Sequence, residues 1–473
     1  MDRSKSLARV SERTQPWDIV IIGGGATGVG CALDAASRGL EVLLLEQHDL
    51  GKGTSSRSTK LVHGGVRYLR QGNISLVREA LRERGILLKN APHVVHKQDF
   101  VVPCYSLWQK LFYGLGLKIY DMLAGGYSLG RSRILSRDET LELLPNVSKS
   151  GLAGGVLYTD GQFDDTRLLI DMAVTADQHG AALLNYAAVR SIAKDVDGRV
   201  NGVEFEDVLS GEKFCVKAKA VINATGAYCD PIRKMSDPTA MPIITFARGS
   251  HIVLHPRFLP GDAALMIPKT SDGRVLFCIP WLGHLLVGTT DVPCETAALG
   301  DVVSEDEIDF LLETAGAYLA KRPTRDDILS RFAGVRPLVS RARATNTAQL
   351  SRSHEMFVDE GGLVTITGGK WTTYRRMAED AVNAAVKVGD LDVSKCITET
   401  LAIDAPRTAG GERLHPKLPY TCEDVIRAVR DEMAMTTEDV LARRTRAQFL
   451  NEQAASELVP MVEEIMVEVR SKN

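Results

Sequence analysis

Three glycines near the N-terminus have the spacing that a diphosphate-binding turn requires. Gly23, Gly25 and Gly28 form the pattern G-x-G-x-x-G between an apolar run at 18–22 and a stretch of small residues. Glu46 closes a second apolar run, 18 residues after Gly28. In this context the glycines allow a tight turn, the approach of a pyrophosphate to the backbone and close helix packing, and the acid accepts hydrogen bonds from a ribose. The pattern predicts a dinucleotide site, but it does not separate FAD from NAD.

A second stretch combines hydroxyl, imidazole and guanidinium groups. Residues 51–73 read GKGTSSRSTKLVHGGVRYLRQGN, which is too polar for a core strand and too long for a simple turn. The hydroxyls could bind phosphate or ribose, and His63 and Arg67 could bind a substrate. A solvated basic loop is the alternative interpretation.

Two further apolar runs end in small residues. Residues 222–226 read INATG, and residues 367–370 read TGGK and lead directly into a helical pattern. Such strand ends allow the backbone to approach a long flat cofactor, and the helix N-terminus can face a carbonyl group. Ordinary strand–helix turns are the alternative for each stretch taken alone.

The composition excludes several classes of protein. The chain has 473 residues, 44% apolar and 25% charged, which is typical of a globular protein and not of a disordered or fibrous one. The net charge of −3 provides no overall field for nucleic acid, so an anion site must be built from a few placed Arg and Lys. The 41 glycines form no repeat and predict particular tight backbone positions.

The cysteines and the N-terminus favour a reducing compartment. Eight cysteines are scattered without a C-x-x-C pair, so neither a disulfide framework nor a metal site is expected. The first fifteen residues are polar, are expected to be frayed, and contain no apolar core of a secretion signal. No apolar run reaches the ~18 residues of a spanning helix. A cytoplasmic location is expected, and attachment to the cytoplasmic face of the inner membrane is left open.

The elements that must position these residues follow from hydrophobic periodicity. Helices are expected at 26–38, 74–90, 106–125, 168–179, 305–321, 370–387, 421–434 and 436–470. Buried strands are expected at 18–23, 41–46, 220–226 and 363–369, a hairpin at 200–208 and 212–216, and further strands at 251–254, 275–279 and 285–288. Parallel-type strands at both ends of the chain therefore bracket an antiparallel middle.

This order predicts an α/β protein, α+β overall, whose nucleotide-binding domain is discontinuous. A Rossmann-like domain is expected from residues 16–80, 151–235 and 335–390. An inserted antiparallel-sheet substrate domain is expected from 81–150 and 236–334, and a short helical C-terminal domain from 398–473.

Several stretches together resemble one enzyme family. They read DIVIIGGGATGVGCALDAASRGLEVLLLE, TSSRSTKLVHGGVRYL, VINATGAY, RGSHIVL, GTTD, FAGVRPL and GGKWTTYRRMAEDA, and they span about residues 17–385. The chain resembles the FAD-dependent glycerol-3-phosphate dehydrogenases, within the wider group of D-amino-acid-oxidase-like flavoproteins. It differs from the bacterial members, which usually carry a longer helical C-terminal domain, because only about 75 residues follow Thr398.

The resemblance implies FAD as the cofactor and sn-glycerol 3-phosphate as the substrate. It places Arg67, Tyr68, Thr290, Arg336 and Arg352 around the substrate, where planar guanidinium groups suit a phosphate. The residues that it implies at the cofactor are Gly23, Gly25, Thr27, Gly28, Glu46, Ser55, Ser56, Ser58, Thr59, Leu61, Val189, Ala224, Thr225, Gly226, Gly369, Lys370 and Thr372.

The resemblance also implies a reaction, hydride transfer from C2 of the substrate to the flavin N5. A base must take the C2 hydroxyl proton, and histidine can do so near neutral pH. We favour His251 as the base and His63 as a positioning group, and Arg336 and Lys370 complete the expected catalytic set. Lys370 would stabilise developing negative charge. A satisfied core histidine is the alternative for His251.

The electron acceptor and the partners are less determined. Respiratory members pass electrons to a quinone, and an oxidase that uses oxygen is a second hypothesis. A flavoenzyme for an amine or a 2-hydroxy acid is a third, although three arginines favour a phosphate over a carboxylate. A flavin-binding sensor is the non-enzymatic hypothesis. It would leave four residues of the motifs without a role, namely His63, Arg67, Arg336 and Lys370. A homodimer is left open.

Peripheral membrane association is also left open. Residues 108–123 could lie at a membrane interface. A helix packed on the inserted domain is favoured over that arrangement, because Gly114 and Gly116 weaken a free amphipathic helix.

Overall fold

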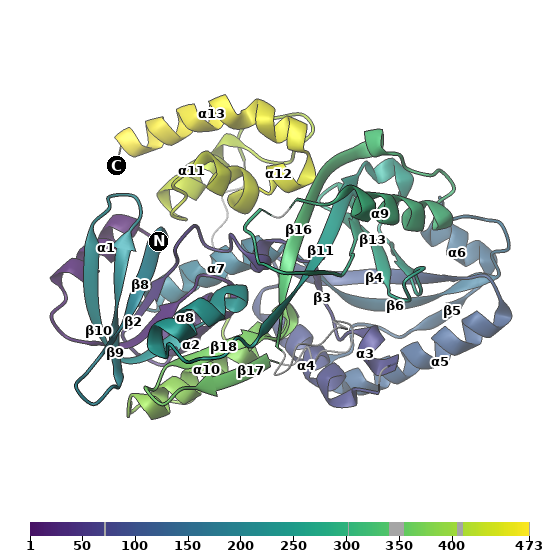
Figure 1. Ribbon diagram of the computed structural model, residues 1–473. Helices are drawn as coiled ribbons and strands as arrows, with labels where there is room; N and C mark the ends of the chain where they lie inside the picture. The colour runs from purple at the N-terminus through teal and green to yellow at the C-terminus, as the bar shows by residue number, and fades with distance from the viewer. Residues whose placement is uncertain (71, 301, 340–353, 404–409, 473) are drawn as a thin grey trace.

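Two sheets organise the protein in the computed structural model, which describes residues 1–70, 72–300, 302–339, 354–403 and 410–472. The first sheet lies at left in Figure 1 and the second at right, with the C-terminal helices (yellow) above them. The first sheet has the order β17 (His354–Val358), β18 (Val364–Gly368), β10 (Lys213–Asn223), β1 (Trp17–Ile22), β2 (Val42–Leu45), β7 (Ala182–Leu184). From β18 to β7 all neighbours are parallel, so the carboxyl ends of these strands meet at one edge.

Helices cover one face of the first sheet. The β-branched run of β1 and the leucines of β2 are buried on both sides, as expected for parallel strands. Their alternate side chains pack on α2 (Ala26–Ser37), α7 (Asp165–Gln178) and α10 (Tyr374–Val388). The opposite face is covered by the antiparallel pair β8 (Ala187–Lys194) and β9 (Val200–Asp207) and by α8 (Cys229–Ser236).

The second sheet is mainly antiparallel and forms the wall of the site described below. Its order is β15 (Val292–Cys294), β11 (Ile244–Leu254), β14 (His284–Gly288), β13 (Leu276–Trp281), β12 (Ala264–Ile267), β4 (Val95–Cys104), β6 (Gly154–Phe163), β3 (Leu61–Val62), with β16 (Ile328–Val339) on β11 and β5 (Arg133–Leu135) on β6. Side chains alternate between two cores: Val101 faces α9 (Glu305–Tyr318), whereas Phe100 and Val102 face the other side.

The remaining helices fall into two groups, one at residues 66–143 and one in the C-terminal segment. They are α3 (Val66–Arg70), α4 (Ile74–Asn90), α5 (Leu107–Ala124), α6 (Arg137–Leu143), α11 (Cys422–Arg430), the π-helix η8 (Asp439–Arg444), α12 (Ala447–Leu450) and α13 (Glu452–Ser471). The C-terminal helices share a core with one face of the second sheet, through residues such as Leu441, Phe449 and Val462.

The structure corrects some expectations. The N-terminal arm is not frayed but forms α1 (Arg3–Glu12), because Asp2 caps it and Ser6 and Val10 are buried. The strands expected at 212–216 and 220–226 are one continuous strand, β10. Strands β3 and β6, which fall within the segments expected for the first domain, pair in the second sheet. Across the described ranges, we find no helix that is both long and apolar enough to span a membrane.

Candidate active site at the carboxyl edge of the first sheet

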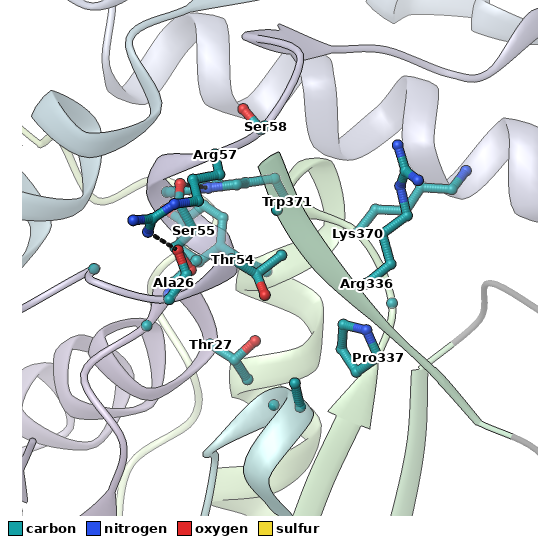
Figure 2. Close-up of a pocket in the computed structure, with 18 of the residues that line it drawn as sticks. Ala26, Thr27, Thr54, Ser55, Arg57, Ser58, Arg336, Pro337, Lys370 and Trp371 are labelled. Atoms are coloured by element: carbon teal, nitrogen blue, oxygen red, sulfur yellow. Dashed lines mark hydrogen bonds between the residues drawn. The ribbon is translucent and has the colours of Figure 1, made fainter. Parts of the chain in front are cut away.

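One large cavity runs between the two sheets, with a volume of about 630 Å³. Its walls include the carboxyl ends of β1, β2, β10 and β18 on one side. Strands β4, β6, β11, β13 and β16 of the second sheet line the other side. This is the crevice in which open α/β sheets bind ligands. Figure 2 shows Ala26, Thr27 and Ser55 at left in the cavity wall and Arg336 and Lys370 at right.

The glycine-rich turn leaves no room for side chains. A Cβ on Gly28 would lie 1.8 Å from the Gly23 carbonyl oxygen, so the helix can approach the strand only at a glycine. Gly23 has a φ of +110°, and a Cβ there would lie 2.8 Å from the Ala224 carbonyl oxygen. Gly25 caps α2, whose first residues Ala26 and Thr27 line the cavity. The N-terminus of α2 therefore faces the cavity, where it favours an anion.

Glu46 is held beside this turn. Its Oε2 accepts a hydrogen bond from the Gly24 N–H at 2.7 Å, and its Oε1 accepts one from the His48 N–H at 2.9 Å. Burial raises the pKa of Glu46, and the two N–H donors oppose this shift. The carboxylate lines the cavity and retains acceptor capacity for a ligand hydroxyl.

The loop at 54–59 closes over the turn. The Ser55 hydroxyl accepts a hydrogen bond from the Ala26 N–H at 2.9 Å, and the Trp371 indole donates to the Ser55 carbonyl at 2.9 Å. The loop therefore ties the start of α2 to the segment that follows β18. Thr54, Ser55, Ser58 and Thr59 of this loop line the cavity.

His251 enters the cavity from β11. Because side chains alternate along a strand, His251 faces away from the core that contains Ile252. Its Nε2 lies 3.0 Å from the Thr59 hydroxyl, and its ring stacks on Phe332 with a centroid distance of 4.8 Å. Burial, followed by the charges of Lys60 and Arg336, lowers the pKa of His251 well below its ordinary value. The imidazole is therefore neutral at pH 7 and can accept a proton.

Arg336 lies on the paired strand β16, opposite Ala247 and four residues along from Phe332, which is opposite His251. Its Nη2 donates to the Thr289 hydroxyl at 3.1 Å, and its Nη1 lies 3.3 Å from Asp291 Oδ1. The guanidinium lies over Gly249, whose Cβ would be 2.2 Å from Nη2. The strand pair thus holds a cation against the cavity wall.

Lys370 and Tyr68 form a further pair in the cavity. Lys370 Nζ lies 3.9 Å from the centre of the Tyr68 ring, which is close enough for a cation–π interaction. A Cβ on Gly65 would lie 2.4 Å from the same ring, so the glycine is required for its position. His63 also lines the cavity, and its backbone N–H donates to the Thr372 hydroxyl at 3.2 Å.

Most of the predicted site residues lie in this cavity. Those in its lining are Gly23, Gly25, Thr27, Glu46, Ser55, Ser58, Thr59, Leu61, His63, Tyr68, Val189, Ala224, Thr225, Gly226, His251, Arg336, Gly369, Lys370 and Thr372. Gly28 and Ser56 lie behind the lining and shape it. The backbone of Arg67 belongs to α3, but its side chain is outside the described part of the structure, as is all of Arg352.

Thr290 was expected on the substrate side but points away from the cavity. Its hydroxyl donates to Glu307 at 2.7 Å and accepts from the Ser250 N–H at 2.8 Å, and it is buried. The neighbouring Thr289 lines the cavity instead. The difference is one residue, because the segment leaves β14 just before it.

An apolar wall was not foreseen. Phe100, Tyr158, Met266 and Phe277 line the cavity from four strands of the second sheet. Each lies in an alternating strand pattern, which indicates burial but not which face borders a ligand. Arg57 also lines the cavity from the loop that binds α2.

The cavity fits FAD. The cradle of Gly23, Gly25 and Gly28 accepts a diphosphate, and Glu46 stands where a ribose would lie. Gly226 and Gly369 line the same cavity as Lys370 and His251. The residues present therefore suit a long dinucleotide.

Comparisons with known proteins match this architecture. The family model described as FAD dependent oxidoreductase matches residues 18–375. The model described as C-terminal domain of alpha-glycerophosphate oxidase matches residues 395–472. The two matches together cover most of the chain.

Individual relatives agree. The mitochondrial glycerol-3-phosphate dehydrogenase of Rattus norvegicus is 40% identical, over 96% of this chain and 71% of the relative. That of Arabidopsis thaliana is 46% identical, over 82% of this chain and 64% of the relative. The solved structure of a Bacillus halodurans glycerol-3-phosphate dehydrogenase complexed with FAD superposes with a TM-score of 0.78 at 29% identity, covering all of this chain and 94% of that one.

Proposed function

The chain belongs to the FAD-dependent glycerol-3-phosphate dehydrogenase family, and on that premise we propose that it oxidises sn-glycerol 3-phosphate to dihydroxyacetone phosphate. The observation that carries this proposal is that Arg336 and the neutral His251 line one cavity with the glycine-rich turn, and that the Arg336 guanidinium lies over Gly249, two residues before His251 on β11. A phosphate needs fixed cations, and an alcohol oxidation needs a base near its carbinol carbon.

Arg336 binds the substrate phosphate in this proposal. The hydrogen bonds of Arg336 to the Thr289 hydroxyl and to Asp291 orient the guanidinium. Little rotamer entropy of the arginine is therefore lost when the phosphate binds. Tyr68 packs beside the substrate, and Arg67 and Arg352 add charge as the family resemblance implies. Thr289 replaces Thr290 in the substrate wall.

His251 then takes the proton of the C2 hydroxyl through Thr59, whose hydroxyl passes its own proton to His251 Nε2 as it accepts the proton of the substrate. The Thr59 hydroxyl, 3.0 Å from this nitrogen, and the stacked Phe332 ring hold the imidazole in place. When bound, FAD supplies the acceptor for the hydride from C2, at its N5. Lys370 offsets negative charge that develops at the reacting end of the cavity. His63 lines the same cavity and positions substrate or cofactor.

The proposed electron acceptor is a quinone, and the outer face of α5 supports contact with a membrane surface. The inner face of α5 packs on the second sheet and on α4 through Gly114, Leu117, Tyr120 and Ala124, as the packed-helix interpretation expects. The outer face exposes large apolar side chains to solvent, at Leu107, Trp108, Leu111, Phe112, Leu115, Ile119 and Met122. Exposed Lys118, Arg131 and Arg133 lie near this stripe in the chain and suit anionic headgroups. Such a stripe exceeds what scattered surface hydrophobes explain.

An oxidase is the second candidate. The match of residues 395–472 to the C-terminal domain of alpha-glycerophosphate oxidase favours it. The two activities differ only in where the electrons leave, so hydrogen peroxide formation with and without a quinone analogue separates them.

The test of the proposed reaction is anaerobic reduction of the bound flavin. sn-Glycerol 3-phosphate, mixed in by hand, should bleach the flavin absorbance before the first spectrum is recorded. Glycerol at the same concentration should not. Bleaching by a 2-hydroxy acid or an amine, with no response to glycerol 3-phosphate, would replace this proposal by the third hypothesis.

A further inference from the structure

A turn of the C-terminal segment, residues 446–449, reaches the candidate base from behind the cavity. Arg446 has a left-handed backbone conformation with a φ of 62° and precedes α12, which carries Phe449. Both side chains are buried, and neither lines the cavity. A left-handed conformation is costly for an arginine, so a specific set of contacts must stabilise it.

Arg446 contacts the loop that carries Thr59. Its Nη2 donates to the Ser56 carbonyl at 2.7 Å and lies 3.3 Å from Asp165 Oδ1, and its Nη1 donates to the Thr166 hydroxyl at 2.8 Å. The guanidinium thus joins the loop to the start of α7.

Lys60 closes the same cluster from the other side of Thr59. Its Nζ donates to the Ser56 carbonyl at 2.8 Å and to Asp165 Oδ2 at 2.6 Å. Ser58 donates to Asp165 Oδ2 from its hydroxyl at 2.7 Å. Thr59 stands between two residues that are anchored to one carboxylate, and its hydroxyl therefore meets His251 in a fixed position.

Phe449 contacts the base through an aromatic stack. Its ring packs edge-on against Phe332 at 4.8 Å, and Phe332 stacks on His251 at 4.8 Å. The Arg446 guanidinium lies 4.2 Å from the centre of the Phe449 ring, so the polar and aromatic routes meet at this turn.

The charges around His251 come from several elements. Lys60 and Asp165 lie behind Thr59, Arg336 lies on β16, and Glu307 of α9 contacts the adjacent Ser250 hydroxyl. Burial, and then the charge of Arg446, lowers the pKa of Lys60 to about 7. A change that moves or removes the charge of Arg446 therefore alters the electrostatic environment of the base as well as its position.

We propose that Arg446 and Phe449 are positioning residues for His251, so that the C-terminal domain completes the active site. Attachment of that domain does not depend on Arg446, since Arg444 already binds Asp49 with two bonds of 2.7 and 2.8 Å. The inference rests on the proposed function, because it assigns a role to the proposed base.

The test compares Arg446→Lys and Phe449→Leu with Val462→Ala in the holoenzyme. Val462 is fully buried among the C-terminal helices, so its truncation destabilises that domain without touching the loop. The rate constant of flavin reduction per bound flavin, at saturating glycerol 3-phosphate, should fall at least about tenfold in the first two variants. The pH midpoint of that rate should shift, and the substrate Kd should change less than about threefold. Val462→Ala should keep the wild-type rate and profile.

A double-mutant cycle and a second readout complete the test. Thr59→Val should remove most of the effect of Arg446→Lys, because contacts in one network are not additive. In the unliganded holoprotein, backbone hydrogen exchange of residues 56–60 should accelerate in Arg446→Lys and not in Val462→Ala.

The inference is overturned if the flavin of Arg446→Lys and of Phe449→Leu is reduced at the wild-type rate, or if all three variants lose rate in proportion to their loss of Tm. If glycerol 3-phosphate does not reduce the wild type, the proposed function fails, and the exchange result still decides the positioning role. Phe449→Leu decides alone if Arg446→Lys does not fold.

Discussion

The guanidinium of Arg336 lies directly over the backbone of Gly249 on the neighbouring strand. A Cβ at Gly249 would be 2.2 Å from Nη2, and the two strands pair with Gly249 opposite Gly334. The Arg336 guanidinium, the proposed phosphate-binding cation, thus occupies the space that a side chain at position 249 would fill.

Gly249→Ala should displace this cation. The side-chain end is flexible, so the protein should fold and keep its FAD, whereas the KM for glycerol 3-phosphate should rise about tenfold or more. Steady-state kinetics with a dye acceptor, together with flavin content, measure both effects. Gly116→Ala in α5 is the matched control, because open space surrounds that glycine. It should leave KM unchanged and stabilise the helix by up to about 1 kcal/mol. An unchanged KM in Gly249→Ala would contradict the role of Arg336.

His251→Gln should lower the rate constant of flavin reduction at saturating substrate by about 10²- to 10⁴-fold, which is typical of a lost general base. Flavin content should be retained, since His251 lies away from the glycine-rich turn. His63→Gln is the comparison and should affect the substrate Kd more than the rate. The reverse pattern would make His63 the base.

His251 should stay unprotonated at a pH at which an ordinary histidine is protonated. Because burial and the charges of Lys60 and Arg336 lower its pKa, the folded protein keeps the ring neutral below its ordinary pKa of 6.5. The unfolded chain binds the proton there, so this residue removes stability as the pH falls below 6.5. In ¹⁵N-histidine NMR, the signal that disappears in His251→Gln should remain that of a neutral ring at pH 6. A midpoint above 6.5 would contradict the assignment.

Asp49 should anchor the C-terminal helices. It is fully buried against Arg443 and Arg444, and the pKa of its carboxyl is about 2, because their charges and hydrogen bonds outweigh its burial. Asp49→Asn should cost about 3–5 kcal/mol, since it takes the anion from the buried Arg444 guanidinium and one of three carboxylates from Arg443. The wild-type advantage is complete above the unfolded pKa of 3.8 and is lost as the pH falls toward 2. Thermal melts at pH 7 and pH 3 measure it, and an equal Tm in both proteins at pH 7 would refute the anchor.

The outer face of α5 should bind anionic vesicles. Trp108→Ser combined with Phe112→Ser should reduce co-sedimentation with vesicles of phosphatidylglycerol and phosphatidylcholine at least about fivefold, because burial of both rings contributes much of the apolar area. The dye-linked activity should not change. Val196→Ser, at an exposed residue between β8 and β9, is the control. Equal sedimentation of all three proteins would exclude this face.

Some of these features are readable from the sequence because their signals are local. The turn at Gly23–Gly28 and the acid at Glu46 belong to one short strand–helix–strand unit, and the structure places both at the cavity. His251 and Arg336 depend on family-like motifs, since a histidine in an apolar strand by itself indicates only burial. Thr290 was misplaced by one residue, because alternation ends where the chain leaves β14.

Other features depend on contacts between distant segments. The polar N-terminus forms α1 because Arg3 reaches Asp207 and Val10 packs on the first sheet, which periodicity over ten residues does not reveal. Arg446 lies 390 positions from Ser56, to which it donates. Helical spacing predicts that residues 436–470 are helical, but it does not indicate which side chain crosses to another domain.

The most direct measurement is the anaerobic titration of the yellow holoprotein with sn-glycerol 3-phosphate, for the wild type and Arg336→Ala. We expect roughly micromolar to low-millimolar substrate to bleach the wild type. Glycerol should not bleach it, and Arg336→Ala should require at least about tenfold more substrate. A wild-type flavin that stays oxidised with glycerol 3-phosphate, or an Arg336→Ala protein that bleaches at the wild-type concentration, would contradict it.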